Sequence, residues 1–264
     1  MTESTLFTIA FAFYILSLLV YFGALFARRD RWAGAGLILA IGGFAAHTAA
    51  LILRTVTSGH APFTNMFESV AFLSWAIALA LIVFGRSARV SRLGPYLMLI
   101  VVALVALASA PIWPKEATPL VPALQSYWLW LHVSVTLLGE AFFAVAFVAS
   151  LLYLAAAADR EEKKARLDAL AYRAVAVGFP LFTLGGLVFG MVWAYRAWGS
   201  YWSWDPKEVW SLITWFVFAL YLHTRIVMGW KGTRSALIAV IGFLAALFTY
   251  FGVNYLLTGL HSYA

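Results

Sequence analysis

Eight long apolar stretches dominate the chain, and each is long enough to cross a lipid bilayer as a helix, which needs about 20 mostly apolar residues. Long runs without alternation predict helices and not a membrane β-barrel. We therefore expect an all-α polytopic membrane helix bundle of about eight transmembrane helices, forming one integral membrane domain over residues 1–264. The stretches are 6–27, 33–54, 67–85, 94–112, 126–157, 173–195, 207–228 and 236–257.

The composition agrees with a chain that lies largely in lipid. Hydrophobic residues make up 64% of the sequence and charged residues only 11%, whereas a soluble domain carries about a quarter charged residues. Much of the surface must therefore face something other than water.

The basic residues predict the orientation of the helices. The net charge of +7 could suggest a nucleic-acid partner, but the distribution of charge argues against one. Most Lys and Arg fall in alternate loops, and positive residues stay on the cytoplasmic side. Both termini are therefore expected outside. The basic loops hold Arg28, Arg29, Arg31, Arg86, Arg89, Arg92, Arg160, Lys163, Lys164, Arg166, Arg173, Arg225, Lys231 and Arg234, against Arg54, Lys115, Arg196 and Lys207 in the others.

The chain contains no cysteine. Because a thiolate is the attacking species in disulfide exchange, the chain cannot itself relay reducing equivalents through thiols. A role as a thiol transporter and any Cys-ligated metal are thereby excluded.

The segment 193–215, WAYRAWGSYWSWDPKEVWSLITW, holds half of the chain's twelve tryptophans. Tryptophan favours the membrane interface, which explains one or two at a helix end. It does not explain Trp198, Trp202 and Trp204 in a short glycine-containing loop. A loop of this kind predicts a flat apolar shelf with indole N–H donors along its edge, suited to a planar ligand.

A helix start follows the tryptophans directly. Asp205 is expected at the N-cap, Pro206 at the first helical position and Glu208 at the third, as in a capping box. This explains Asp205 and Glu208 structurally, and a fixed helix start would also hold the tryptophan loop rigid.

Five histidines and one buried acid are the remaining candidates. His60 and His261 are expected in outer loops, His132 near the outer end of its span, and His223 towards the inner end. His47 is more typical of a hydrogen bond between helices than of a ligand. An acid inside a span, as at Glu140, is usually paired or functional. Gly186 and Gly190 form a GxxxG pair that predicts close helix packing.

The tryptophan segment identifies a resemblance. WGSYWSWDPKEVWSLITW, followed by LHTR and a terminal GLHSY, resembles the CcsA/ResC family of system II cytochrome c assembly proteins and their tryptophan-rich WWD domain. GHAPFTNMFES and LHVSV occur in the family's order as well, so the resemblance covers nearly the whole chain.

The resemblance implies a haem-handling site. His132 and His261 match two outer histidines that flank the WWD domain and ligate haem iron, and His223 matches a histidine of a haem site nearer the cytoplasm. The implied cofactor-binding residues are His132, His261, His223, Trp198, Trp202, Trp204 and Asp205, and no catalytic residue is implied. Arg196 and Lys207 are the cations nearest to haem propionates.

The implied function is delivery of haem b across the membrane and its presentation at the outer face, where CxxCH apocytochromes form thioethers with it. The implied partner is a ResB-like (CcsB) membrane subunit, which would supply the second ligand opposite His223. Together the two would act as a holocytochrome c synthase. The implied location is the bacterial cytoplasmic (inner) membrane, or the thylakoid membrane for a plastid-encoded chain.

Two alternatives stay open at this point. A membrane b-type cytochrome with bis-His haem would transfer electrons, and would want histidine pairs at matched depth on facing spans. A haem exporter or a HemX-like regulator would move haem without a synthase role.

Overall fold

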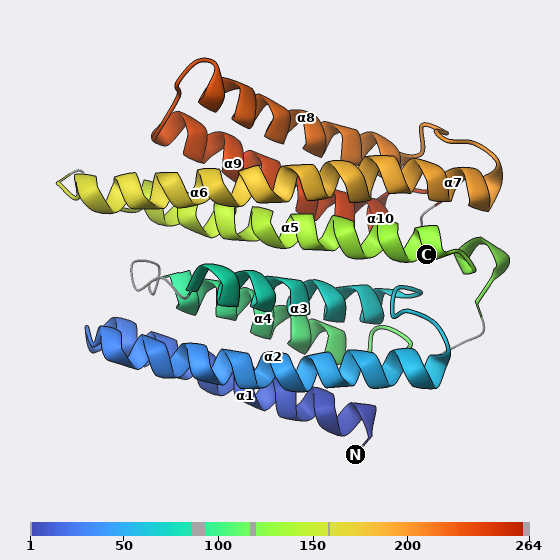
Figure 1. Ribbon diagram of the computed structural model, residues 1–264, viewed down its shortest axis with the longest axis horizontal. Coiled ribbons are helices and arrows are strands. Elements are labelled where there is room, and N and C mark those ends of the chain that lie inside the picture. The colour runs from blue at the N-terminus through green and yellow to red at the C-terminus, as the bar shows by residue number, and fades with distance from the viewer. Residues whose placement is uncertain (1, 86–92, 117–119, 158, 261–264) are drawn as a thin grey trace. The chain divides into compact units, whose positions relative to one another are not determined.

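The computed structural model describes residues 2–85, 93–116, 120–157 and 159–260. Every long element in these ranges is a helix, so the predicted all-α fold is confirmed (Figure 1). The chain forms two compact units, an N-terminal unit of Met1–Pro119 and a C-terminal unit of Leu120–Ala264. Each is described by itself.

The described residues of the N-terminal unit form a bundle of four helices. These are α1 (Glu3–Phe26), α2 (Asp30–Ser58), α3 (Met66–Gly85) and α4 (Gly94–Ser109). Helix α1 packs on α2 and α4, and α3 packs on α4 and α2. Small residues allow the close approach: a Cβ at Gly43 would lie 2.7 Å from the Tyr14 ring, and Ser17 Oγ donates to the carbonyl of Gly36 at 2.8 Å.

The C-terminal unit is built around α5 (Tyr127–Leu154), which contacts both the α6–α7 stretch and α9. The π-helix η3 (Thr183–Phe189) joins α6 (Glu161–Phe182) to α7 (Gly190–Trp198) without a break. After α8 (Pro206–Ile226), the π-helix η4 (Phe248–Gly252) likewise joins α9 (Thr233–Leu247) to α10 (Val253–Leu256). A short 3₁₀ turn, η2 (Pro122–Leu124), precedes α5.

Seven helical stretches within the described ranges are long and apolar enough to span a membrane, and Gly94–Ser109 is a shorter apolar helix. The largest difference from the expected ranges lies in Glu161–Trp198, which runs for 38 residues, whereas 173–195 was predicted. The charged stretch before residue 173 is helical because Glu161 and Glu162 favour a helix N-terminus. Arg166 also donates to Glu162 one turn away.

Glycines set the contact between α5 and the α6–α7 stretch. A Cβ at Gly139 would lie 2.8 Å from the backbone nitrogen of Phe182, and one at Gly185 would overlap the backbone of Thr136. A Cβ at Gly186 would meet only the Phe182 ring of its own stretch, at 3.5 Å. The predicted close packing is therefore present, but Gly185 provides it together with Gly190, and the expectation for Gly186 was wrong.

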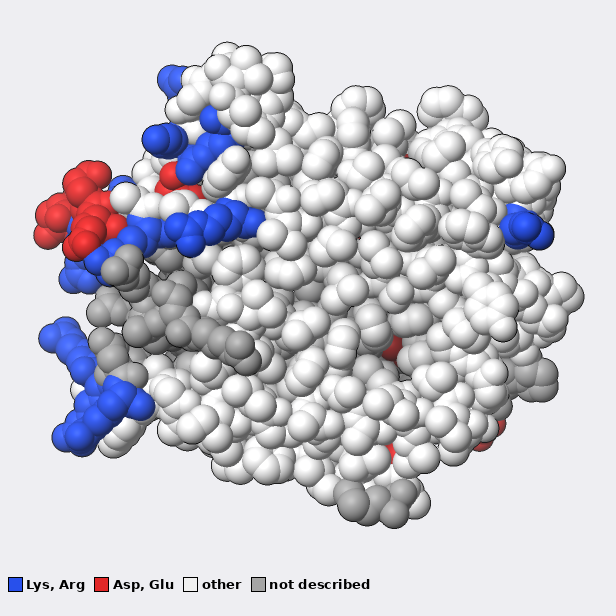
Figure 2. All heavy atoms as spheres, in the orientation of Figure 1, with Lys and Arg blue, Asp and Glu red and all other residues white. Residues whose placement is uncertain are grey.

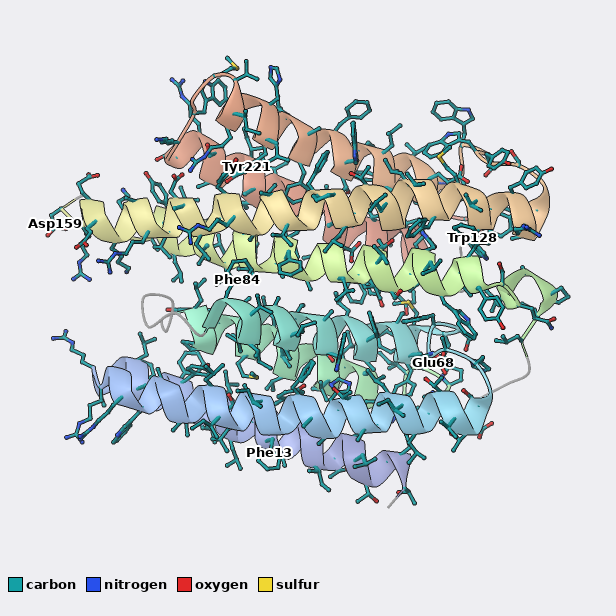
Figure 3. All side chains as sticks on the ribbon, in the orientation of Figure 1. Phe13, Glu68, Phe84, Trp128, Asp159 and Tyr221 are labelled. Carbon is teal, nitrogen blue, oxygen red and sulfur yellow. The ribbon has the colours of Figure 1, made fainter. Side chains whose placement is uncertain are left out.

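Basic side chains of the C-terminal unit gather where α6 begins and where α8 leads into α9 (Figure 2). Figure 3 places Trp128 near the start of α5 and Asp159 at the opposite end of this unit. Arg225 is fixed there by Asp168, with Nη1–Oδ1 at 2.8 Å and Nη2–Oδ2 at 2.5 Å. The end that carries Trp128 also carries the tryptophan segment, so this segment and most of the unit's basic side chains lie at opposite ends.

Candidate functional site

His132 lies in the second turn of α5, half-buried against η3. Its Nδ1 is 2.8 Å from the carbonyl oxygen of Gly185, and a carbonyl only accepts, so Nδ1 is the donor. With Nδ1 as the donor, a neutral imidazole has its lone pair on Nε2, the arrangement common in histidines that ligate metals.

The π-helix makes this contact possible. In η3 the Gly190 N–H donates to the Gly185 oxygen, five residues back, and the same oxygen accepts from His132. A Cβ at Gly190 would lie 3.0 Å from the His132 ring, so glycine leaves the space that the imidazole fills. π-segments of this kind occur often at functional sites.

Aromatic rings continue from His132 to the end of α7. The His132 and Trp193 rings are stacked, with centroids 5.6 Å apart and planes at 9°. Trp193 meets Trp198 edge-on at 4.8 Å. Because Trp193 Nε1 also donates to the Ala123 carbonyl at 3.0 Å, the stack is fixed to η2 as well as to α5.

Trp202 and Trp204 form a second group of rings, perpendicular to each other with centroids 5.8 Å apart. The three predicted shelf residues therefore do not make one plane. Trp198 is the last residue of α7 and not a loop residue, because the left-handed Gly199 ends the helix after it. In place of the expected flat shelf, the structure has indole rings at different angles.

Trp204 is 72% exposed and has a φ of 58°. A bulky residue in the left-handed region is strained, and such strain persists where the surrounding structure fixes it, often at ligand sites. The chain thus holds a large apolar ring outwards at an energetic cost.

The helix start after Trp204 is as predicted. Asp205 is the N-cap of α8 and forms the capping box with Glu208. The Glu208 carboxylate also accepts from the backbone N–H of Ser203 at 2.7 Å. Ser203 lies between Trp202 and Trp204, so the capping box holds the tryptophan loop as well as the helix.

The C-terminal tail also contacts the start of α8. Asp205 Oδ1 accepts from the backbone N–H of Leu260 at 2.6 Å. His261, which follows Leu260, lies outside the described residues, so its predicted role as a haem ligand stays a prediction.

Glu140 has a charged neighbour that the sequence did not identify. It is buried in α5, 6% exposed, and interacts electrostatically with Lys207. Lys207 Nζ also donates to Asn254 Oδ1 at 2.9 Å. Because Lys207 is held inside the unit, Arg196, exposed at the end of α7, is the better of the two predicted cations for a propionate.

His223 lies in the last turn of α8 and is exposed. It continues an apolar stripe on the same face, formed by Ile213, Phe216 and Leu220. Arg225, two residues further along the helix, forms an ion pair with Asp168. This stripe therefore offers one imidazole beside apolar side chains.

The other two histidines are buried in the N-terminal unit. His47 is 0% exposed, with Phe7 and Tyr14 ring centroids 5.2 and 6.0 Å away. His60 is 5% exposed, and its Nδ1 donates to the Ala61 carbonyl at 3.1 Å. Both rings are thus packed within the core of the N-terminal unit.

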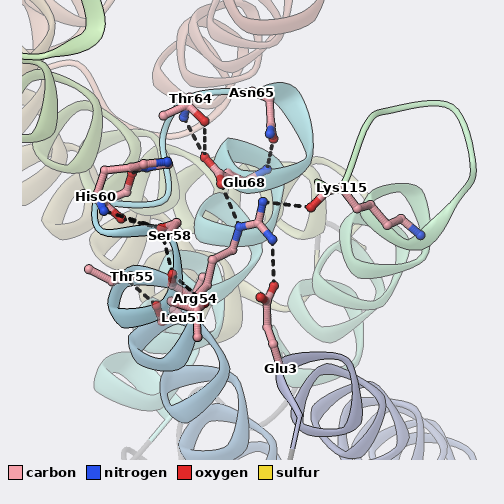
Figure 4. Close-up of polar contacts among 12 residues, drawn as sticks. Glu3, Leu51, Arg54, Thr55, Ser58, His60, Thr64, Asn65, Glu68 and Lys115 are labelled. Carbon is pink, nitrogen blue, oxygen red and sulfur yellow. Dashed lines mark hydrogen bonds and ion pairs between the residues drawn. The ribbon is translucent and has the colours of Figure 1, made fainter. Parts of the chain in front are cut away.

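An ion-pair network closes one end of the N-terminal unit (Figure 4). Arg54 donates from Nε to Glu68 at 2.7 Å, from Nη1 to Glu3 at 3.0 Å and from Nη2 to the Lys115 carbonyl at 2.9 Å. Asn65 Oδ1 accepts from the Glu68 backbone N–H at 2.9 Å, so Asn65 caps the start of α3. A cavity of about 540 Å³ lies beside the network, and among the charged residues that line it Arg54 pairs with Glu3, while Lys115 Nζ donates to the Ser109 carbonyl.

Fold and site together define a class: a multi-pass helical membrane protein with a fixed histidine among aromatic rings at one end and an exposed histidine near the other. Residues 63–261 match the cytochrome C assembly protein family. The chain therefore belongs to this family, and within it to the CcsA proteins of cytochrome c biogenesis.

The relatives cover most of the chain. The CcsA protein of Prochlorococcus marinus (strain MIT 9303) is 42% identical over 82% of this chain and 80% of its own length, and that of Mesostigma viride is 35% identical over 99% and 96%. The CcsA protein of Chlamydomonas reinhardtii is 42% identical over 81% of this chain, which spans 64% of that relative.

A solved structure has the same fold. Cytochrome c Heme Lyase CcmF superposes with a TM-score of 0.75 at 20% identity, over 95% of this chain and 47% of that protein. At this identity the likeness supports the helical membrane fold alone.

Proposed function

We propose that the chain presents haem at the outer face of a membrane for covalent attachment to apocytochrome c, as the haem-handling subunit of a cytochrome c synthase. Membership in the cytochrome c assembly family supports this role. The observation that carries it is His132, whose Nδ1 is held by Gly185 and whose ring stacks on Trp193.

His132 Nε2 and an imidazole of His261 are the proposed axial ligands of the haem iron, and bis-imidazole ligation suits a low-spin haem. Trp198, Trp202 and Trp204 would bury the apolar ring, and Arg196 would meet a propionate.

The substrate is proposed to be haem b, because attachment requires both vinyl groups. Each thiol of an apocytochrome CxxCH motif adds its sulfur to one vinyl carbon and its hydrogen to the other. Two thioether bonds form without an external oxidant. The chain contributes ligation and positioning, and no acid–base pair is assigned to it.

The inner site is proposed to need a second subunit. His223 is exposed on an apolar face, and a ResB-like (CcsB) membrane protein is the proposed source of the other ligand. Haem would enter near His223 from the cytoplasmic side and move to His132. The proposed membrane is the bacterial cytoplasmic membrane, or the thylakoid membrane in a plastid.

Electron transfer between bis-His haems is less well supported. His132 lies in the second turn of α5, and His223 in the last turn of α8. Both helices begin at the tryptophan end, so the two histidines are too far apart to share one iron. In a haem exporter or a HemX-like regulator, the tryptophan loop and both outer histidines would have no role in attaching haem to a cytochrome.

The test is the absorption spectrum of purified His132→Ala and His261→Ala, each with and without added imidazole. Each variant should lose the low-spin outer-haem signal, and imidazole should restore it by filling the space of the lost ring. His60→Ala is the control and should keep the signal. Wild-type spectra in both His132→Ala and His261→Ala would refute the proposed ligand pair.

A further inference from the structure

One carboxylate joins the start of α8 to the C-terminal tail. Asp205 Oδ2 accepts from the backbone N–H of Lys207 at 3.0 Å, and Oδ1 accepts from the backbone N–H of Leu260 at 2.6 Å. The residue is 6% exposed. Both oxygens are thus used by backbone donors, and hydrogen bonds to a carboxylate are the strong ones.

The tail lies in direct contact with the helix start. A Cβ at Gly259 would overlap Asp205 Oδ1 and would lie 3.0 Å from Pro206 Cδ. Only glycine allows the backbone to approach this closely. The tail is therefore held at two consecutive residues. Leu260 forms the hydrogen bond, and Gly259 lets the backbone come close enough to form it.

A second contact fixes the chain before the tail. Lys207 Nζ donates to Asn254 Oδ1 at 2.9 Å, and Asn254, in α10, is 1% exposed. The segment from Asn254 to Leu260 is thus tied to the first turn of α8 at both ends. Chain termini without such contacts are poorly ordered.

We propose that Asp205 is a positioning residue that acts through the tail: it holds Leu260 in place and thereby favours iron binding by the next residue, His261, the proposed haem ligand. Asp205 belongs to the sequence-predicted haem-binding set, but its two oxygens serve Lys207 and Leu260. This inference rests on the proposed function. Holding the tail in place reduces the entropy lost when His261 binds iron.

Three variants of the full chain separate this role from helix capping. Asp205→Ser keeps a good N-cap, but one short hydroxyl does not replace two carboxylate oxygens, so the bond to Leu260 is lost. Gly259→Ala attacks the same contact from the tail and leaves Asp205 unchanged. Glu208→Gln is the control, since it removes a charge from the capping box without touching the tail.

The first measurement needs no haem. Amide exchange of the tail peptide, followed by mass spectrometry, should be about tenfold faster in Asp205→Ser and Gly259→Ala, as expected for the loss of a hydrogen bond to a charged group. Glu208→Gln should exchange like the wild type. Unchanged exchange in both tail variants would overturn the proposal.

The second measurement is the outer-haem spectrum of the same variants beside His261→Ala. Asp205→Ser and Gly259→Ala should lose low-spin haem and regain it with imidazole, as His261→Ala does. If His261→Ala alone loses haem, the positioning role is wrong and the ligand assignment stands. If His261→Ala keeps a wild-type spectrum, the ligand assignment itself fails, whatever the exchange data show for the tail.

Discussion

At the end of the N-terminal unit where α3 begins, three charged side chains bind one another: Arg54 pairs with Glu68 and Glu3. Where α8 begins in the C-terminal unit, Asp205 and Glu208 instead bind backbone N–H groups of a loop and a tail. The first arrangement closes a bundle. The second holds an exposed tryptophan and the residue before a histidine in fixed places, which is what a ligand site needs.

The histidines differ in the same way. His47 and His60 are buried among residues of the N-terminal unit, whereas His132 is half-buried beside a tryptophan and His223 is exposed. A histidine that ligates a large ring must be reachable, so among these four histidines we expect haem binding to depend on His132 and His223.

The largest expected effect is on the inner haem. In a complex with its ResB-like partner, His223→Ala should abolish the inner-haem absorption and leave the outer signal. His47→Ala is the matched control, because it removes a buried ring and should lower stability without removing haem. Loss of the inner haem in His47→Ala and its retention in His223→Ala would show that the buried histidine, and not the exposed one, binds the inner haem.

Breaking the ion-pair network should affect folding and not haem. Arg54→Met leaves Glu68 buried without its partner, and loss of one member of a buried pair costs about 3–5 kcal/mol. The expected result is a lower midpoint of denaturant unfolding with an unchanged haem spectrum. Arg54→Met combined with Glu68→Leu should recover part of the loss, and a haem defect in the double variant would show that this network serves the site.

At Trp204 stability and function should move in opposite directions. Trp204→Gly removes a strained left-handed tryptophan, so we expect stability to rise by about 1 kcal/mol. The same change removes an exposed ring from the proposed site, and outer haem should fall without rescue by imidazole. Thermal unfolding and the haem spectrum of one preparation measure both. A stable variant with full haem would remove Trp204 from the site.

The smallest effect is expected at an exposed ion pair in α6. Arg166 and Glu162 are 49% and 81% exposed, and such pairs contribute about 0.3–0.5 kcal/mol. Glu162→Gln should therefore leave the unfolding midpoint nearly unchanged, in contrast to Arg54→Met. A loss comparable to that of Arg54→Met would mean that burial does not explain the difference between the two pairs.

The sequence predicts the helices well because each span must satisfy its backbone within itself. It also predicts the capping box at Asp205, since that pattern is local. The π-helix at residues 183–189 was missed, although Pro180 lies shortly before it and the Gly185–Gly186 pair lies within it. Nothing in the sequence indicates that the Gly185 carbonyl would orient His132.

The shape of the site and its tertiary contacts could not be predicted. The angle between Trp202 and Trp204 depends on the left-handed backbone at Trp204, which no propensity favours. The bond from Asp205 to Leu260 joins residues 55 positions apart, and the proximity of Lys207 to Glu140 is likewise tertiary. The orientation with both termini outside stays a prediction from charge.

In the proposed function, His132 holds haem iron where the thioether bonds form. The most direct test is the yield of covalently attached cytochrome c in cells that carry the chain, its ResB-like partner and an apocytochrome. His132→Ala should reduce the yield to background, and imidazole in the medium should restore a large part of it. A wild-type yield in His132→Ala without imidazole would show that His132 does not hold haem iron at the attachment site.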